Sequence, residues 1–251
     1  MSGHSKWATT KHRKAAVDAK RSKLFSKLSR IITVAAKTGG DPNPENNASL
    51  AAAIDKAKSY SLPKDKIQSA IDKAFAASGG ADFEEIVYEG YGPAGVAFYV
   101  EGLTDNRNRT AADVRALFTR AGGNLGATNS VAFQFERTGE ITIDKSAVAD
   151  EEELLLQIAD AGGEDLEDGG DDFVVVTEPA DLMAVKKALE AAGIETKGAE
   201  LTMRARNETE LDVSDARKVM RLVDGLEELD DVQEVYHNMA MTEEIAAALD
   251  E

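Results

Sequence analysis

Cysteine is absent from the 251-residue chain. Its absence excludes disulfides, thiolate metal sites and cysteine nucleophiles, and it is typical of proteins that work in a reducing cytoplasm. No stretch approaches the roughly 18 consecutive apolar residues of a membrane-spanning helix, and no apolar run follows the first charges as in a signal peptide. Aromatic residues make up only 6% of the chain, so its cores must depend on aliphatic side chains. We expect a soluble, cytoplasmic protein without membrane contact.

Acidic side chains are scarce at the start of the chain, although its formal net charge is −17. Residues 1–37 contain ten Lys or Arg and one acid, which gives them a charge of +9. Residues 38–75 are neutral, and residues 76–251 carry 14 Lys or Arg against 40 Asp or Glu, a charge of −26. Segregation of this kind indicates a basic, nucleic-acid-binding end on an acidic body.

The basic end is predicted to be an arm followed by a helix. Residues 1–19 lack apolar periodicity, whereas a helical pattern begins near Lys20 and ends at Gly39–Pro42. Its apolar positions are Leu24, Leu28, Ile31, Ile32 and Ala35. Its basic positions, Lys20, Lys23, Lys27, Arg30 and Lys37, fall on one stripe beside them. Two further helices are predicted over Asn47–Tyr60 and from Pro63, and Ser78–Gly80 is a plausible linker.

Beyond this linker, short strands alternate with helices. The predicted strands are Ile86–Tyr88, Val96–Val100, Val131–Phe135, Ile141–Ile143, Phe173–Val176, Leu201–Arg206 and Val232–Tyr236. The predicted helices follow Thr104 and cover Glu151–Ala161, Pro179–Ala192 and Ser214–Leu229. This order indicates two β-rich groups, each suited to a ferredoxin-like α/β sandwich.

Several letter patterns match known sites but lack the context that those sites require. Gly90–Gly95 fits G-x-G-x-x-G, yet a strand follows it, so its glycines are expected to shape a hairpin rather than bind a dinucleotide. The acidic runs Glu151–Glu153 and Glu164–Asp172 lack EF-hand spacing and are expected to be solvated faces. The three histidines lack metal-ligand spacing, and no Ser-His-acid arrangement is recognisable. We expect no metal, no cofactor and no catalytic residue.

Polar side chains crowd the stretch Thr104–Thr110, between a predicted strand and a predicted helix. One interpretation is structural: Asp105, Asn108 or Thr110 caps the helix, and Thr110 with Asp113 fits a capping box. The other is a second polar site, at which an arginine pair binds phosphate or carboxylate. This site would comprise Asp105, Asn106, Arg107, Asn108 and Arg109.

The arm contains Trp7, the only tryptophan of the chain. Its ring either packs on the helical domain or stacks on an unpaired base while neighbouring cations contact phosphates. Alternatively, the arm is only a solubilising tail. The predicted nucleic-acid-binding residues are Lys6, Trp7, Lys11, His12, Arg13, Lys14, Lys20, Arg21, Lys23, Lys27 and Arg30.

Five segments resemble signatures of the YebC/PmpR family. They are Gly3–Trp7, Lys11–Lys14, Tyr88–Pro93, Leu103–Thr110 and Gly122–Gly126. The resemblance extends nearly from end to end. Members of this family are described as DNA-binding transcriptional regulators. Their mitochondrial relatives are translational activators of cytochrome c oxidase subunit I, and some bacterial members are linked to the ribosome.

The resemblance implies an α+β fold with a helical N-terminal domain plus two ferredoxin-like α/β sandwich domains, one inserted in the other. Residues 1–78 would form the basic arm and three-helix domain. Residues 79–135 and 208–251 would form a discontinuous α/β domain, and residues 136–207 the inserted α/β domain. The basic arm and the first helix would be the nucleic-acid face.

We expect a non-enzymatic, nucleic-acid-binding regulator of gene expression that resembles DNA-binding transcriptional regulators. The alternative is a ribosome-associated translation factor, or translational activator, that binds RNA. A flexible arm with one aromatic slightly favours RNA, and no helix-turn-helix signature supports groove reading, whereas the family description favours transcription. Two other classes stay open: an enzyme that uses the Asp105–Arg109 cluster, and a scaffold whose acidic domains bind a basic protein.

Overall fold

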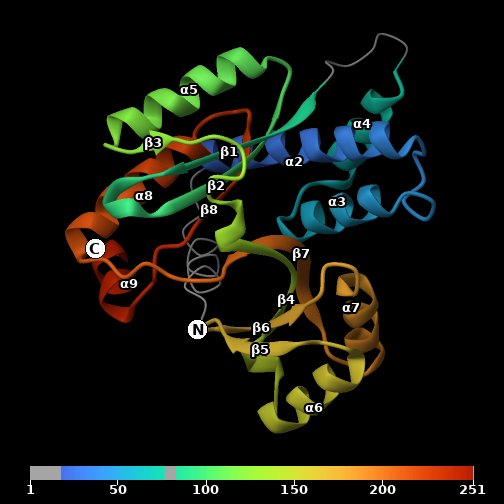
Figure 1. Cartoon of the computed structure of the whole chain (residues 1–251). Coiled ribbons are helices and arrows are strands. Elements are labelled where there is room, and N and C mark those ends of the chain that lie inside the picture. The colour runs from blue at the N-terminus through green and yellow to red at the C-terminus, as the bar shows by residue number, and fades with distance from the viewer. Residues whose placement is uncertain (1–17, 77–82, 251) are drawn as a thin grey trace. The chain divides into compact units, whose positions relative to one another are not determined.

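The computed structural model describes residues 18–76 and 83–250 and shows helices combined with two four-stranded sheets (Figure 1). The predicted α+β class is confirmed. The described chain divides into two compact units, one formed by residues 84–138 and 202–250 and the other by residues 18–76, 83 and 139–201. Most of the predicted arm and the linker Ser78–Gly80 lie outside the described residues.

Three helices near the N-terminus form a small core, as predicted (Figure 1). They are α2 (Asp18–Gly39), α3 (Ala48–Ser59) and α4 (Lys64–Ala74). The core is built from Leu28, Ile32, Leu50, Ile67 and Ile71 among others. The Thr33 hydroxyl ties α2 to α4, because it lies 3.0 Å from the carbonyl oxygen of Ala70. Pro63 is the N-cap of α4 rather than its first helical residue, since its ψ of 143° is extended.

Asn47 fixes the turn between α2 and α3. Its side chain is buried, and its Oδ1 accepts the amide N–H of Leu50 at 3.0 Å, which caps α3. Its Nδ2 donates to the carbonyl oxygens of Ala35 and Asp41, at 3.0 and 3.2 Å. A single amide side chain therefore satisfies backbone groups at the end of one helix and the start of the next.

Replacing Asn47 with alanine is expected to lower the free energy of unfolding by about 2 kcal/mol, because one helix cap and two part-buried hydrogen bonds to carbonyl oxygens are lost together. Asn46→Ala is the matched control, because the Asn46 side-chain amide donates to the Asp41 carboxylate in a solvent-exposed hydrogen bond. That control should cost below about 0.5 kcal/mol. Urea unfolding followed by circular dichroism measures both, and equal losses would contradict this account of the turn.

The first sheet contains four strands in the order β3-β1-β2-β8. They are β1 (Glu84–Tyr91), β2 (Ala97–Thr104), β3 (Asn124–Leu125) and β8 (Val232–His237), and every pairing is antiparallel. Helices α5 (Arg107–Arg120) and α8 (Val213–Glu227) pack on one face through a core that includes Phe98, Phe118 and Leu226. The turn η1 (Pro93–Gly95) joins β1 to β2, so the glycine-rich motif shapes a hairpin, as predicted.

The second sheet has the order β5-β6-β4-β7. Its strands are β4 (Phe135–Asp144), β5 (Asp165–Asp168), β6 (Asp172–Thr177) and β7 (Thr196–Ala205). The short turn η3 (Lys145–Ala147) and helix α6 (Glu151–Ala161) follow β4, and α7 (Leu182–Ala191) follows β6. This strand–helix–strand–strand–helix–strand order is the ferredoxin-like pattern. Both helices share one core with the sheet.

One local prediction is wrong, and other elements extend or add to what was predicted. Val131–Phe135 is not a strand, because Ala132–Gln134 is the 3-10 turn η2 and β4 begins at Phe135. The predicted strand Ile141–Ile143 is confirmed, as the later part of the longer strand β4. Within the acidic run Glu164–Asp172, Asp165–Asp168 is the edge strand β5, paired only with β6. The strand β3 and the terminal helix α9 (Glu243–Asp250) were not predicted.

Candidate functional site

Helix α2 carries the part of the predicted nucleic-acid interface that the structure describes. Lys23, Lys27 and Arg30 are partly exposed on one side of the helix, next to the apolar positions that face α3 and α4. The Arg30 guanidinium lies 4.6 Å from the centroid of the Phe83 ring, a cation–π arrangement that orients it. The helix thus brings three of the predicted cations into one stripe.

The other members of that predicted interface cannot be placed. Lys6, Trp7, Lys11, His12, Arg13 and Lys14 lie outside the described residues. The backbone of Lys20 and Arg21 belongs to α2, but their side chains also lie outside the description. Contacts of these eight residues with nucleic acid stay a prediction.

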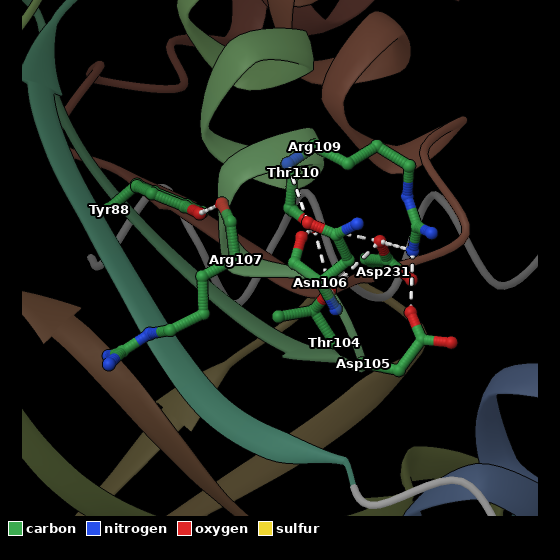
Figure 2. A network of polar contacts seen from close by, with 8 residues as sticks. All are labelled: Tyr88, Thr104, Asp105, Asn106, Arg107, Arg109, Thr110 and Asp231. Carbon is green, nitrogen blue, oxygen red and sulfur yellow. Dashed lines mark hydrogen bonds and ion pairs between the residues drawn. The ribbon is translucent and has the colours of Figure 1, made fainter.

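The predicted second polar site lies where α5 begins after β2 (Figure 2). Asn106 is the N-cap of α5, and its side-chain oxygen accepts the amide N–H of Arg109 at 3.1 Å. The caps proposed from the sequence, Asp105, Asn108 and Thr110, were therefore the wrong residues. Thr110 is already inside the helix, and its hydroxyl lies 3.1 Å from the carbonyl oxygen of Asn106.

Asp231, from the turn before β8, joins this helix start to a distant part of the chain. Its Oδ2 accepts from the Nη2 of Arg109 at 2.7 Å and from the Thr110 hydroxyl at 2.8 Å. The Thr104 hydroxyl lies 3.2 Å from the same oxygen, and the Asp231 carbonyl accepts the amide N–H of Leu103 at 2.8 Å. Burial alone would raise the pKa of Asp231, but the hydrogen bonds from Arg109 and Thr110 lower it below its ordinary value.

The two arginines of the site do not converge. Figure 2 shows the side chains of Arg107 and Arg109 extending to opposite sides of the helix start. The Nη2 of Arg109 donates to both Asp231 and Asp105. These hydrogen bonds raise the pKa of the Arg109 guanidinium above its ordinary value. Arg107 Nη1 lies 3.5 Å from a carboxylate oxygen of Glu84, and its backbone carbonyl accepts from the Tyr88 hydroxyl. The geometry supports a structural role, in which the polar residues hold the start of α5 against Asp231, rather than a site at which both arginines bind one anion.

Glu89, which sequence reasoning missed, organises the loop between β3 and β4. Its buried carboxylate accepts three backbone amides, from Asn129 at 2.7 Å, Val131 at 2.8 Å and Ala132 at 2.7 Å. Its own carbonyl accepts the amide N–H of Gly126 at 2.7 Å. The predicted strand Ile86–Tyr88 ended just before Glu89 and left it outside, whereas β1 extends to Tyr91. A carboxylate that is buried in a strand must be hydrogen bonded, and that requirement was the missed signal.

The described part of the chain shows neither a metal-binding cluster nor a membrane-spanning helix. No group of three or more His, Asp or Glu side chains there is placed to hold a metal ion. Across residues 18–76 and 83–250, no helix has the length and apolar character needed to cross a membrane.

Comparison with known proteins extends over nearly the whole chain. Residues 5–77 match the family model described as the TACO1/YebC protein N-terminal domain, and residues 83–239 match the model for the TACO1/YebC second and third domain. A probable transcriptional regulatory protein of Bifidobacterium animalis subsp. lactis is 51% identical over 252 residues, covering 100% of both chains. Another, from Rubrobacter xylanophilus, is 53% identical over 248 residues, covering 98% of each.

A solved structure gives the same result at the level of the fold. The crystal structure of a conserved hypothetical protein from Aquifex aeolicus is 45% identical, with a TM-score of 0.83 over 92% of this chain and 95% of that one. The resemblance seen in the short signatures is therefore confirmed across the full length. The chain belongs to the TACO1/YebC family, whose relatives in these comparisons are named probable transcriptional regulatory proteins.

Proposed function

We propose that this protein is a regulator of gene expression that binds nucleic acid through its basic N-terminal end. The observation that carries the proposal is the charge split of +9 in residues 1–37 against −26 in residues 76–251. Helix α2 supports it by lining up Lys23, Lys27 and Arg30 on one side. The names of the relatives support the regulatory role.

The charge split has two physical consequences. Cations on the arm and on α2 attract phosphates and release their counterions, so affinity should fall steeply as salt rises. The acidic remainder of the chain repels phosphates, which restricts the orientations in which the protein docks. We propose that binding is confined to the basic end for this reason, in a cytoplasmic protein that needs no cofactor.

The target class divides the proposal into two forms. In one, the protein binds promoter DNA as a transcriptional regulator; the relatives' names support the regulatory role in transcription. In the other, it binds RNA on the ribosome as a translation factor. Seven of the first 14 residues are Lys, Arg, His or Trp, a composition suited to irregular RNA surfaces. Sedimentation with ribosomal particles at moderate salt, with duplex DNA as competitor, separates the two forms.

A charge-neutralising variant tests the interface itself. The triple substitution Lys23→Gln, Lys27→Gln and Arg30→Gln removes the described stripe and is expected to weaken binding of an oligonucleotide by about 10- to 100-fold. The matched control neutralises three exposed lysines of α4, Lys64, Lys66 and Lys73, with the same change in net charge.

Fluorescence anisotropy with a labelled RNA and a labelled DNA duplex measures both variants. The control should bind within about threefold of the wild type, because salt largely screens the attraction between a phosphate and lysines that do not contact it. An equal loss in the two triple variants would show that net charge, rather than α2, determines binding, and would refute the proposed interface.

A further inference from the structure

The loop before β4 presents an aromatic ring to solvent. Phe133 is 69% exposed, more than any other large hydrophobic residue in the described part of the chain. Tyr91, on β1, is 39% exposed and lies nearby, since its hydroxyl oxygen accepts from the Nε2 of Gln134 at 3.0 Å. A single exposed apolar side chain is common on protein surfaces, so the inference depends on the polar and charged groups that lie next to this ring.

The backbone on both sides of this ring is fixed. The amide N–H of Ala132 is held by the Glu89 carboxylate, which also holds Val131. On the other side, the carbonyl of Gln134 accepts the amide N–H of Arg206 at 2.8 Å, and its Oε1 accepts from Asn238 Nδ2 at 3.3 Å. Because hydrogen bonds already order this loop, binding of a ligand to Phe133 costs little conformational entropy of the loop.

Two arginines lie on backbone segments next to this loop, within an otherwise acidic part of the chain. Arg206 is bonded to the residue after Phe133 through its backbone, and its side chain is 57% exposed. Arg137, at the start of β4, is 55% exposed. Their carboxylate partners, Glu136 at 3.6 Å and Glu101 at 3.8 Å, lie beyond normal hydrogen-bond length. Exposed pairs of this kind are weak and can exchange for a phosphate.

We propose that Phe133, Tyr91 and Arg206 form a second contact for single-stranded RNA, in which an unpaired base stacks on Phe133 and a phosphate meets Arg206. This inference rests on the proposed nucleic-acid function and adds a site in the acidic part of the chain. An aromatic ring and an exposed arginine on hydrogen-bonded backbone segments offer one group for a base and one for a phosphate of a single strand. RNA loops present unstacked bases, whereas a DNA duplex keeps its bases inside the helix.

The test uses the full chain and a fluorescein-labelled RNA of fifteen uridines, with Phe133→Ala as the main variant. Loss of one stacked base should weaken binding by about 5- to 100-fold. Phe133→Trp should restore affinity, and its indole fluorescence should be quenched by RNA beyond the quenching seen for Trp7 in the wild type. Arg206→Gln should reduce the slope of log affinity against log salt by about 0.7.

Leu156→Ala is the matched control, because Leu156 on α6 is an equally exposed apolar residue at 68%. It should leave binding unchanged. If Phe133→Ala binds the RNA like wild type while the α2 triple variant does not, this second site is refuted and the proposed function stands. If the wild type does not bind the RNA, both the second site and the RNA form of the function fail.

Discussion

Replacing Asp231 with alanine is expected to lower the free energy of unfolding by about 2–4 kcal/mol, because its removal leaves buried partners unsatisfied. The Asp231 side chain is 10% exposed and accepts from Arg109, Thr110 and Thr104 through a single oxygen. These donors come from residues more than 120 positions earlier in the sequence, so the carboxylate joins the start of α5 to the turn before β8. Urea unfolding of the full chain measures the loss.

Asp105→Ala is the matched control for this prediction. Asp105 binds the same guanidinium nitrogen of Arg109 at 2.8 Å, but its side chain is 44% exposed. Exposed ion pairs contribute little, so the control should cost below about 1 kcal/mol. If both substitutions cost the same, the ion pair alone matters and the buried hydroxyl contacts contribute nothing.

The contribution of Asp231 should also depend on pH in a defined direction. Its pKa is lower in the folded protein than in the unfolded chain, where an aspartate has a pKa of about 3.9. Its stabilising contribution is therefore fully present above the unfolded pKa and is lost as pH falls through the lower folded pKa. The difference in stability between wild type and Asp231→Asn should stay constant from about pH 5 to 7 and shrink below about pH 4.

Replacing Glu89 with glutamine is expected to cost about 2–4 kcal/mol, because three backbone amides point at its carboxylate at 2.7–2.8 Å. An amide side chain has a single acceptor oxygen, and its NH2 group would face N–H donors that it cannot satisfy. The loss should be concentrated in the loop, so hydrogen exchange at Val131 and Ala132 should accelerate more than exchange in α8.

Glu85→Gln provides the control on the same strand. Glu85 points to the same side of β1 as Glu89, but it is exposed. Its substitution should change stability by less than about 0.5 kcal/mol. If the Val131 amide keeps its wild-type protection in Glu89→Gln, the carboxylate does not hold the loop.

The parts of the fold that sequence could predict are those with strong local periodicity. The apolar spacing of α2 and the bounds of α6 were readable because each helix buries one face and ends at a glycine. The strand β8 was readable because its apolar residues form a short run after a turn. Each of these depends on neighbours within a few residues, which a pattern can capture.

What sequence could not predict depends on distant partners. Val131–Gln134 has the composition of a strand, but its amides turn toward Glu89, about 40 residues earlier. The Thr104–Thr110 stretch showed its polar character, yet the roles of its residues depend on Asp231, which is not local. The strand β5 is acidic because it lies at the sheet edge, where its outer side chains face water.

The salt dependence of RNA binding tests the central claim most directly. The proposed basic interface predicts that log affinity falls with log salt with a slope of about −4 to −7, and that Lys23→Gln, Lys27→Gln and Arg30→Gln together reduce its magnitude by about 2. The matched triple variant at Lys64, Lys66 and Lys73 should keep the wild-type slope. A slope near zero for the wild type, or an unchanged slope in the α2 variant, would contradict binding through the basic end of the chain.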